Sequence, residues 1–163
     1  MKNLVLIGMM GCGKSTVGAL LARRLGWELV DTDQMIEARE GCTIQELFAA
    51  RGEAYFRERE REAAQALAGQ ENLVIACGGG LPLWEDCIAP LKAGGRVVFL
   101  YRDPGVIYDT VSMAGRPLGQ GGRAAFCARF AQREPIYRRW ADLVVEHFAS
   151  PQEAAEQILE GAE

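Results

Sequence analysis

Residues 8–15 carry the residue types that are needed to bind a polyphosphate. The segment reads GMMGCGKS and fits the pattern G-x-x-x-x-G-K-[ST], in which glycines let successive backbone N–H groups turn toward phosphate oxygens. Lys14 adds a positive charge for the β- and γ-phosphates, and Ser15 offers a hydroxyl to Mg²⁺. The segment therefore predicts a site for ATP and Mg²⁺. The residues expected to contact the nucleotide are Gly11, Cys12, Gly13, Lys14, Ser15 and Thr16.

Two carboxylates, Asp31 and Asp33, follow a short strand-like segment at residues 28–31. They occupy alternating positions on either side of Thr32, so one can serve Mg²⁺, directly or through water, while the other meets a substrate hydroxyl. The alternative role for a carboxylate at this point is to cap the N-terminus of a helix. Both interpretations are open for this pair.

A third group of residues lies on one face of a predicted helix around Phe56. Glu60 falls within an otherwise apolar stripe, and a buried carboxylate needs a partner. Arg57 is well placed to pair with Glu60 and still present guanidinium nitrogens to an anion. The other charges of this run are expected to form a solvated face; they are Glu58, Arg59, Arg61 and Glu62.

The elements that position these residues alternate between strand-like and helical patterns. Strand-like runs occur at residues 3–7, 28–31, 73–77, 96–101 and, more weakly, 143–146. A helix is predicted from Lys14 to a stop at Gly26, and a last helix is predicted after Ser150 and Pro151. Alternation of this kind indicates parallel βαβ units, whose ligands bind beyond the carboxyl ends of the strands. The glycines at 78–80 end the third strand and suit close approach to backbone, although a plain turn is the alternative.

Composition limits the classes of protein and of partner. A chain of 163 residues with 49% apolar residues can enclose one substantial core, and a net charge of −4 offers no basic footprint for nucleic acid. The five cysteines are odd in number and lack a C-x-x-C pair, so we expect reduced thiols rather than a disulfide framework or a metal site. No apolar stretch approaches the length of a membrane span. We therefore expect a cytoplasmic protein without nucleic-acid or membrane partners. We also expect a monomer, although the sequence carries no signal for the oligomeric state. The three tryptophans, Trp27, Trp84 and Trp140, are expected to be packing residues.

Residues 114–122, AGRPLGQGG, interrupt the alternation of strands and helices. The segment is rich in glycine and has too few apolar residues to hold itself against a core. It predicts a mobile lid, and an ordinary surface loop is the alternative.

Taken in order, these residues resemble the shikimate kinases over nearly the whole chain. The shared pattern consists of GMMGCGKSTVG, Asp31-Thr32-Asp33, Phe56-Arg57-x-x-Glu60, Gly78-Gly79-Gly80, Arg116-Pro117-Leu118 and Arg133-x-Pro135-Ile136-Tyr137. The resemblance implies phosphorylation of shikimate at its 3-hydroxyl by ATP. It also implies a single P-loop kinase domain over residues 1–163, of the nucleoside-monophosphate-kinase type. Such a domain is a three-layer α/β/α fold with a five-stranded parallel sheet, an acceptor-binding region at about 33–61 and a short lid at about 114–123.

The resemblance implies a role for each matching residue on the acceptor side. Asp33 resembles the residue that binds the acceptor hydroxyls and takes part in catalysis. Arg57 and Arg133 resemble the pair that grips the substrate carboxylate, with Glu60 as a support for Arg57. Gly79 and Gly80 resemble residues that line the same pocket.

The donor side follows in the same way. Arg116 resembles the lid arginine that reaches the γ-phosphoryl group, and Lys14 resembles its catalytic partner from the loop. Ser15 and Asp31 resemble the Mg²⁺ side of the site. Residues 106–114 contain no arginine, although the family usually has one there to stack on adenine, so the adenine contact is unassigned.

The sequence leaves the roles of some residues, and the function, open. Arg102 and Asp103 end the fourth strand and face the site by topology, while Arg123 can either supplement Arg116 or lie on a helix surface. Two other functions remain as alternatives to a shikimate kinase. One is a small-molecule kinase with another acceptor, such as a sugar acid, and the other is a nucleotide-binding regulatory module without turnover.

Overall fold

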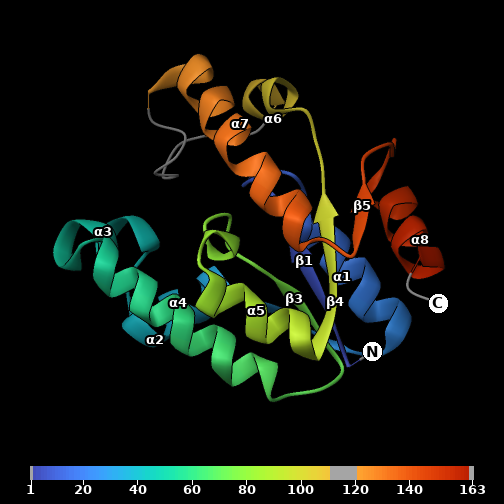
Figure 1. Cartoon of the computed structure of the whole chain (residues 1–163), viewed down its shortest axis with the longest axis horizontal. Coiled ribbons are helices and arrows are strands. Elements are labelled where there is room, and N and C mark those ends of the chain that lie inside the picture. The colour runs from blue at the N-terminus through green and yellow to red at the C-terminus, as the bar shows by residue number, and fades with distance from the viewer. Residues whose placement is uncertain (1, 111–120, 162–163) are drawn as a thin grey trace.

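The computed structural model describes residues 2–110 and 121–161, and these form a five-stranded parallel sheet with helices on both faces (Figure 1). The strands are β1 (Asn3–Ile7), β2 (Glu28–Asp31), β3 (Leu73–Ala76), β4 (Gly95–Leu100) and β5 (Leu143–Val145). Their order across the sheet is β2-β3-β1-β4-β5, and every neighbouring pair is parallel. The predicted α/β fold class is confirmed.

The central strands have the sequences that a sheet covered on both faces requires. β1 and β3 are buried along their whole length and are apolar except for Asn3. The Asn3 side chain is satisfied, since it donates to the backbone oxygen of Gln70 and accepts from the N–H of Leu73. β2 and β5 lie at the edges and are only partly buried. The five predicted strands are confirmed, with boundaries that shift by one residue at three of them.

The helices form two layers, one on each face of the sheet. On one face α1 (Lys14–Leu25) packs against α8 (Pro151–Gly161). On the other face lie α4 (Glu53–Ala68), α5 (Glu85–Gly94) and α7 (Gly122–Trp140). The remaining helices are α2 (Thr32–Glu40), α3 (Ile44–Arg51), the short 3₁₀ helix η1 (Leu81–Leu83) and α6 (Pro104–Thr110).

Local signals mark the end of α1 and the start of α8, as predicted. Gly26 adopts a left-handed conformation with φ of 70° and donates its N–H to the oxygen of Ala22, which closes α1. At the start of α8 the Ser150 hydroxyl accepts from the N–H of Glu153 at 3.1 Å. The carboxylate of Glu153 accepts in turn from the N–H of Ala149.

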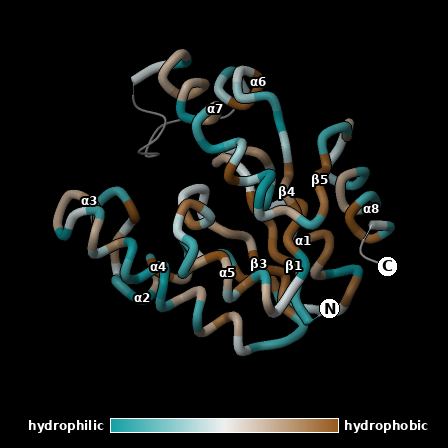
Figure 2. Tube along the Cα trace, viewed as in Figure 1, coloured by the Kyte–Doolittle hydropathy of each residue, from teal (hydrophilic) through white to brown (hydrophobic). Residues whose placement is uncertain are grey.

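The apolar side chains form one large core and one small cluster. The large core encloses the central strands, and the hydrophobic colours of Figure 2 follow these strands and the inner sides of the helices. The small cluster consists of Ile36, Leu47 and Phe56, and it joins α2, α3 and α4. These helices therefore have packing of their own beside the sheet. Among the described helices, none combines the length and the apolar character that a membrane crossing needs.

Candidate active site

The phosphate loop connects the end of β1 to the start of α1. Gly8, Gly11 and Gly13 have φ values of 152°, 82° and 100°, which side chains rarely adopt. A Cβ on Gly8 would lie 2.7 Å from the backbone oxygen of Leu100, so this position also needs glycine for space. α1 begins at Lys14, so the positive end of its dipole faces the loop. The left-handed conformation of the glycines, the space at Gly8 and the helix dipole together form a site for a phosphate group.

Lys14 and Ser15 make hydrogen bonds within the loop and to the end of β2. The Lys14 ammonium donates to the backbone oxygens of Gly8 and Met9 at 2.8 and 3.0 Å, so it lies over the loop. The Ser15 hydroxyl donates to Oδ2 of Asp31 at 3.0 Å. The other oxygen of Asp31 accepts from the N–H of Gln34 and caps α2. The two roles left open for Asp31 are therefore compatible, one for each carboxylate oxygen.

Asp33 lies in the first turn of α2, where burial raises the pKa of its carboxyl to about 6, helped by the negative charge of Asp31. Lys14 and Arg57 face it and act in the opposite direction. Gly78 leaves the space that the carboxylate occupies, since a Cβ there would lie 2.9 Å from the Asp33 carboxyl carbon.

Thr32 joins the same two segments and was not identified from the sequence. Its buried hydroxyl accepts from the N–H of Gly78 at 2.9 Å, which ties the end of β2 to the glycine turn after β3. The turn therefore lies beside the candidate site, and Gly78 and Gly79 line the cavity at the phosphate loop.

Arg57 and Glu60 form the predicted pair on α4. Nη1 of Arg57 lies 2.5 Å from Oε1 of Glu60, and Glu60 is 1% exposed. Burial raises the pKa of the Glu60 carboxyl to about 7, while the hydrogen bond and charge of Arg57 oppose that rise. Asp33 raises the same pKa and Arg133 lowers it, so all four side chains lie near one another. The predicted pairing is confirmed.

Arg133 is buried on α7 and faces the glycine turn. A Cβ on Gly79 would lie 3.5 Å from its Nη1, and among the described residues no hydrogen-bond partner reaches that nitrogen. A buried guanidinium nitrogen without an acceptor is costly, which makes Arg133 a candidate for binding an anion. Tyr137, one turn further along α7, donates its hydroxyl to the backbone oxygen of Gly79 at 2.7 Å and holds the turn against α7.

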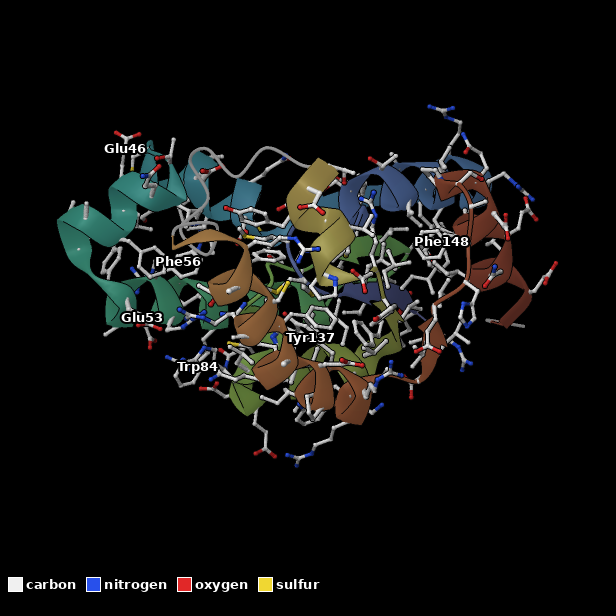
Figure 3. All side chains as sticks on the ribbon, turned by 90° about the horizontal axis from the view of Figure 1, so that it is seen from above. Glu46, Glu53, Phe56, Trp84, Tyr137 and Phe148 are labelled. Atoms are coloured by element: carbon white, nitrogen blue, oxygen red, sulfur yellow. The ribbon has the colours of Figure 1, made fainter. Side chains whose placement is uncertain are left out.

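A cavity of about 800 Å³ opens along the phosphate loop. Its lining includes residues 10–17, both Asp31 and Asp33, the turn at 77–79, Arg102 and residues 148–151. The stretch at 148–151 was not identified from the sequence, although its position after β5 indicates the carboxyl edge of the sheet. In Figure 3 Phe148 lies at the opposite side of the molecule from Phe56, so this end of the cavity lies far from Phe56 on α4.

Contacts within the described residues bear on the alternatives left open at the fourth strand and beyond. Arg102 donates to the backbone oxygen of Gly11 at 3.3 Å and lines the cavity, whereas Asp103 accepts from the N–H of Val106 at the start of α6. Arg123 pairs with the exposed Asp109 at 3.1 Å, which supports its role on the helix surface. Arg116 lies outside the described residues, as does the predicted lid apart from residues 121–123.

Trp84 differs from the expectation of a packing residue. It is 41% exposed and its ring lies over the guanidinium of Arg57, with 5.1 Å from the guanidinium carbon to the ring centroid. The sequence contains no signal for this contact, because residues 57 and 84 belong to different elements.

Comparison with known proteins relates the chain as a whole to a family of enzymes. A family model described as shikimate kinase matches residues 10–163. A shikimate kinase from Moorella thermoacetica is 42% identical over 145 residues, which cover 88% of this chain and 84% of that protein. One from a Sulfurihydrogenibium species is 37% identical over 160 residues, or 98% of this chain and 96% of that protein.

Solved structures agree with the sequence comparison. The shikimate kinase from Acinetobacter baumannii in complex with shikimate superposes with a TM-score of 0.92 at 35% identity, covering 98% of this chain and 92% of that one. A gluconokinase from Sinorhizobium meliloti, at 17% identity and a TM-score of 0.59, covers 99% of this chain and 91% of that one and shares the fold alone.

Proposed function

The chain belongs to the shikimate kinase family, and we propose that it transfers the γ-phosphoryl group of ATP to the 3-hydroxyl of shikimate. The observation that supports this acceptor most strongly is the environment of Arg133. Its buried guanidinium has a nitrogen without a partner among the described residues, and it lies beside the same glycine turn as Arg57. A carboxylate bound between the two arginines would satisfy both.

We propose that Asp33 binds the hydroxyl end of the acceptor. Shikimate carries a carboxylate at one end and hydroxyls at the other, so it needs arginines on one side and an acceptor carboxylate on the other. Asp33 interacts electrostatically with both Lys14 and Arg57, which lie on the phosphate and acceptor sides of the site. We assign it the roles of orienting the 3-hydroxyl and receiving its proton late in the transfer.

ATP and Mg²⁺ belong to the loop side of the cavity. The oxygens of Ser15 and Asp31, 3.0 Å apart, fit a hard cation that prefers oxygen ligands. Bound there, Mg²⁺ would neutralise charge on the β- and γ-phosphates. Lys14 would move from its backbone acceptors to the phosphate oxygens, joined by Arg116 from the lid. The nucleotide contacts that we propose for the loop are Gly11, Cys12, Gly13, Lys14, Ser15 and Thr16.

We propose that residues 148–151 contact the adenine of ATP. This stretch lines the cavity together with the loop and offers the aromatic ring of Phe148 and the ring of Pro151. An apolar wall of this kind suits a planar base. It provides a base-binding surface in a chain that lacks an arginine at residues 106–114.

All the residues proposed for the site belong to one chain, so we propose a monomer as the active unit. The five cysteines are unpaired in the described structure, which suits the reducing conditions of the cytoplasm.

Measurement of ADP release from the purified protein with ATP and Mg²⁺ tests the function. We expect strong stimulation by shikimate and none by gluconate or quinate, which also carry a carboxylate and hydroxyls. Stimulation by gluconate alone would support the sugar-acid alternative. Binding of ATP without turnover of any acceptor would support the regulatory alternative.

A further inference from the structure

Trp84 is an exposed aromatic residue on a rigid backbone. The backbone N–H of Trp84 donates to the backbone oxygen of Leu81. The backbone oxygen of Trp84 accepts from the N–H groups of Cys87 and Ile88 at the start of α5. The preceding η1 is anchored by the buried side chains of Leu81 and Pro82. The exposure of the ring therefore does not come from a loose segment.

The guanidinium of Arg57 is held on its edge and on its face by different groups. Nη1 and Nη2 bond to Glu60 and Glu53, at 2.5 and 3.3 Å. The rings of Trp84 and Phe56 lie 5.1 and 5.7 Å from the guanidinium carbon, within the range of cation–π contacts. Figure 3 shows Trp84, Phe56 and Glu53 on the same side of the molecule.

The contact with Trp84 differs in kind from the two ion pairs. A carboxylate on the edge of a guanidinium occupies N–H donors, whereas an aromatic face leaves those donors available. Glu53 is exposed and can draw Arg57 toward solvent, away from the glycine turn. A stacked ring limits that movement and uses none of the donors that a substrate carboxylate needs.

The glycine turn limits the movement of the Arg57 guanidinium on another side. A Cβ on Gly80 would lie 2.8 Å from Nη1 of Arg57, so the guanidinium lies directly against this backbone. Gly80 and Trp84 are joined through η1, whose N–H groups at Leu83 and Trp84 bond back to Gly80 and Leu81. One short rigid segment therefore contacts Arg57 at two points.

We propose that Trp84 is a positioning residue that stacks on Arg57 and holds its free N–H groups toward the acceptor carboxylate. The proposal rests on the assignment of Arg57 to the acceptor in the proposed function. It adds a residue that acts through Arg57 and does not itself touch the substrate.

Steady-state kinetics of Trp84→Leu and Trp84→Phe test the proposal. For Trp84→Leu we expect the KM for shikimate to rise about three- to tenfold, with kcat and the KM for ATP close to those of the wild type. Trp84→Phe keeps an aromatic face and should restore most of the affinity. Trp140→Leu is a matched control, since the ring of Trp140 stacks on Arg139 at 5.2 Å but lines no part of the site.

A double-mutant cycle separates positioning from general packing. In an Arg57→Ala background, Trp84→Leu should leave shikimate binding, measured by calorimetry, unchanged. An equal loss with and without Arg57, or a Trp84→Leu enzyme with an unchanged KM for shikimate, would overturn the proposal. The wild-type enzyme tests the proposed function separately, because failure to phosphorylate shikimate would refute that function whatever the Trp84 variants do.

Discussion

Glu60 and Arg57 form a buried ion pair within one turn of α4, with 2.5 Å between Oε1 and Nη1. Glu60 is 1% exposed, and burial raises the pKa of its carboxyl from 4.5 to about 7. The pair supports one arginine of the proposed acceptor site at a cost in the free energy of folding.

The stability of the protein should depend on pH through Glu60. Because its pKa is higher in the folded state, the folded protein binds more protons than the unfolded chain between pH 4.5 and about 7. The free energy of unfolding should therefore fall as the pH rises through this range, by an amount of the order of 3 kcal/mol from this group. Urea unfolding of the wild type and of Glu60→Gln, at pH 5 and pH 8, measures the difference.

In that comparison the Gln variant should lose less stability between the two pH values. Asp33 titrates in an overlapping range, so the remaining slope of Glu60→Gln reports on it. Glu62→Gln, on the more exposed face of α4, is the matched control. Equal slopes for the wild type and Glu60→Gln would show that Glu60 does not titrate in this way.

The reaction should require ionised Asp33. Its pKa is raised to about 6, so kcat/KM for shikimate should increase with pH through that value, because only the carboxylate accepts the hydroxyl proton. Asp33→Asn should lower kcat about 10²- to 10⁴-fold and remove this acidic limb from the pH–rate profile. An acidic limb that survives the substitution would assign the titration to another group.

Arg133 should contribute to function at the expense of stability. Removing its buried, partly unsatisfied guanidinium relieves a desolvation cost, so Arg133→Met should melt at or above the temperature of the wild type. The same variant should raise the KM for shikimate about ten- to hundredfold, because a charge-assisted fork is lost.

Thermal melting with and without shikimate tests both parts of that prediction. Shikimate should raise the melting temperature of the wild type and of Arg129→Met, an exposed position on the same helix. At the same shikimate concentration, the melting temperature of Arg133→Met should rise much less. A normal shift in Arg133→Met would remove Arg133 from the acceptor site.

A methyl group at Gly80 should weaken the binding of shikimate and leave the stability of the fold nearly unchanged. The Cβ of Gly80→Ala would lie 2.8 and 3.1 Å from the two terminal nitrogens of Arg57, which are the far end of a flexible side chain. The backbone there has φ of −90°, so no conformational strain is added.

We therefore expect a several-fold rise in the KM for shikimate with a change in the free energy of unfolding below about 1 kcal/mol. Gly69→Ala is the control, because its nearest neighbour would be the oxygen of Ala66 at 3.8 Å. Equal kinetics for the two variants would mean that Arg57 yields to the methyl group without loss of substrate binding.

The strands, the phosphate loop and the helix ends could be predicted from the sequence because their signals are local. An apolar run such as residues 73–77, a glycine at a left-handed position such as Gly26 and a capping serine such as Ser150 each act on their own neighbours. The pairing of Arg57 with Glu60 was also predictable, since residues three apart meet on one helix face.

The order of motifs along the chain determined by itself the family, the fold class and the candidate residues for phosphate and acceptor. The tertiary structure alone decided which distant groups meet: Thr32 with Gly78, Trp84 with Arg57, and residues 148–151 with the phosphate loop. It also decided the raised pKa values of Asp33 and Glu60 and the unsatisfied nitrogen of Arg133. The physical reason is that desolvation and stacking depend on atoms brought in by other elements of the fold, and no short stretch of sequence encodes those neighbours.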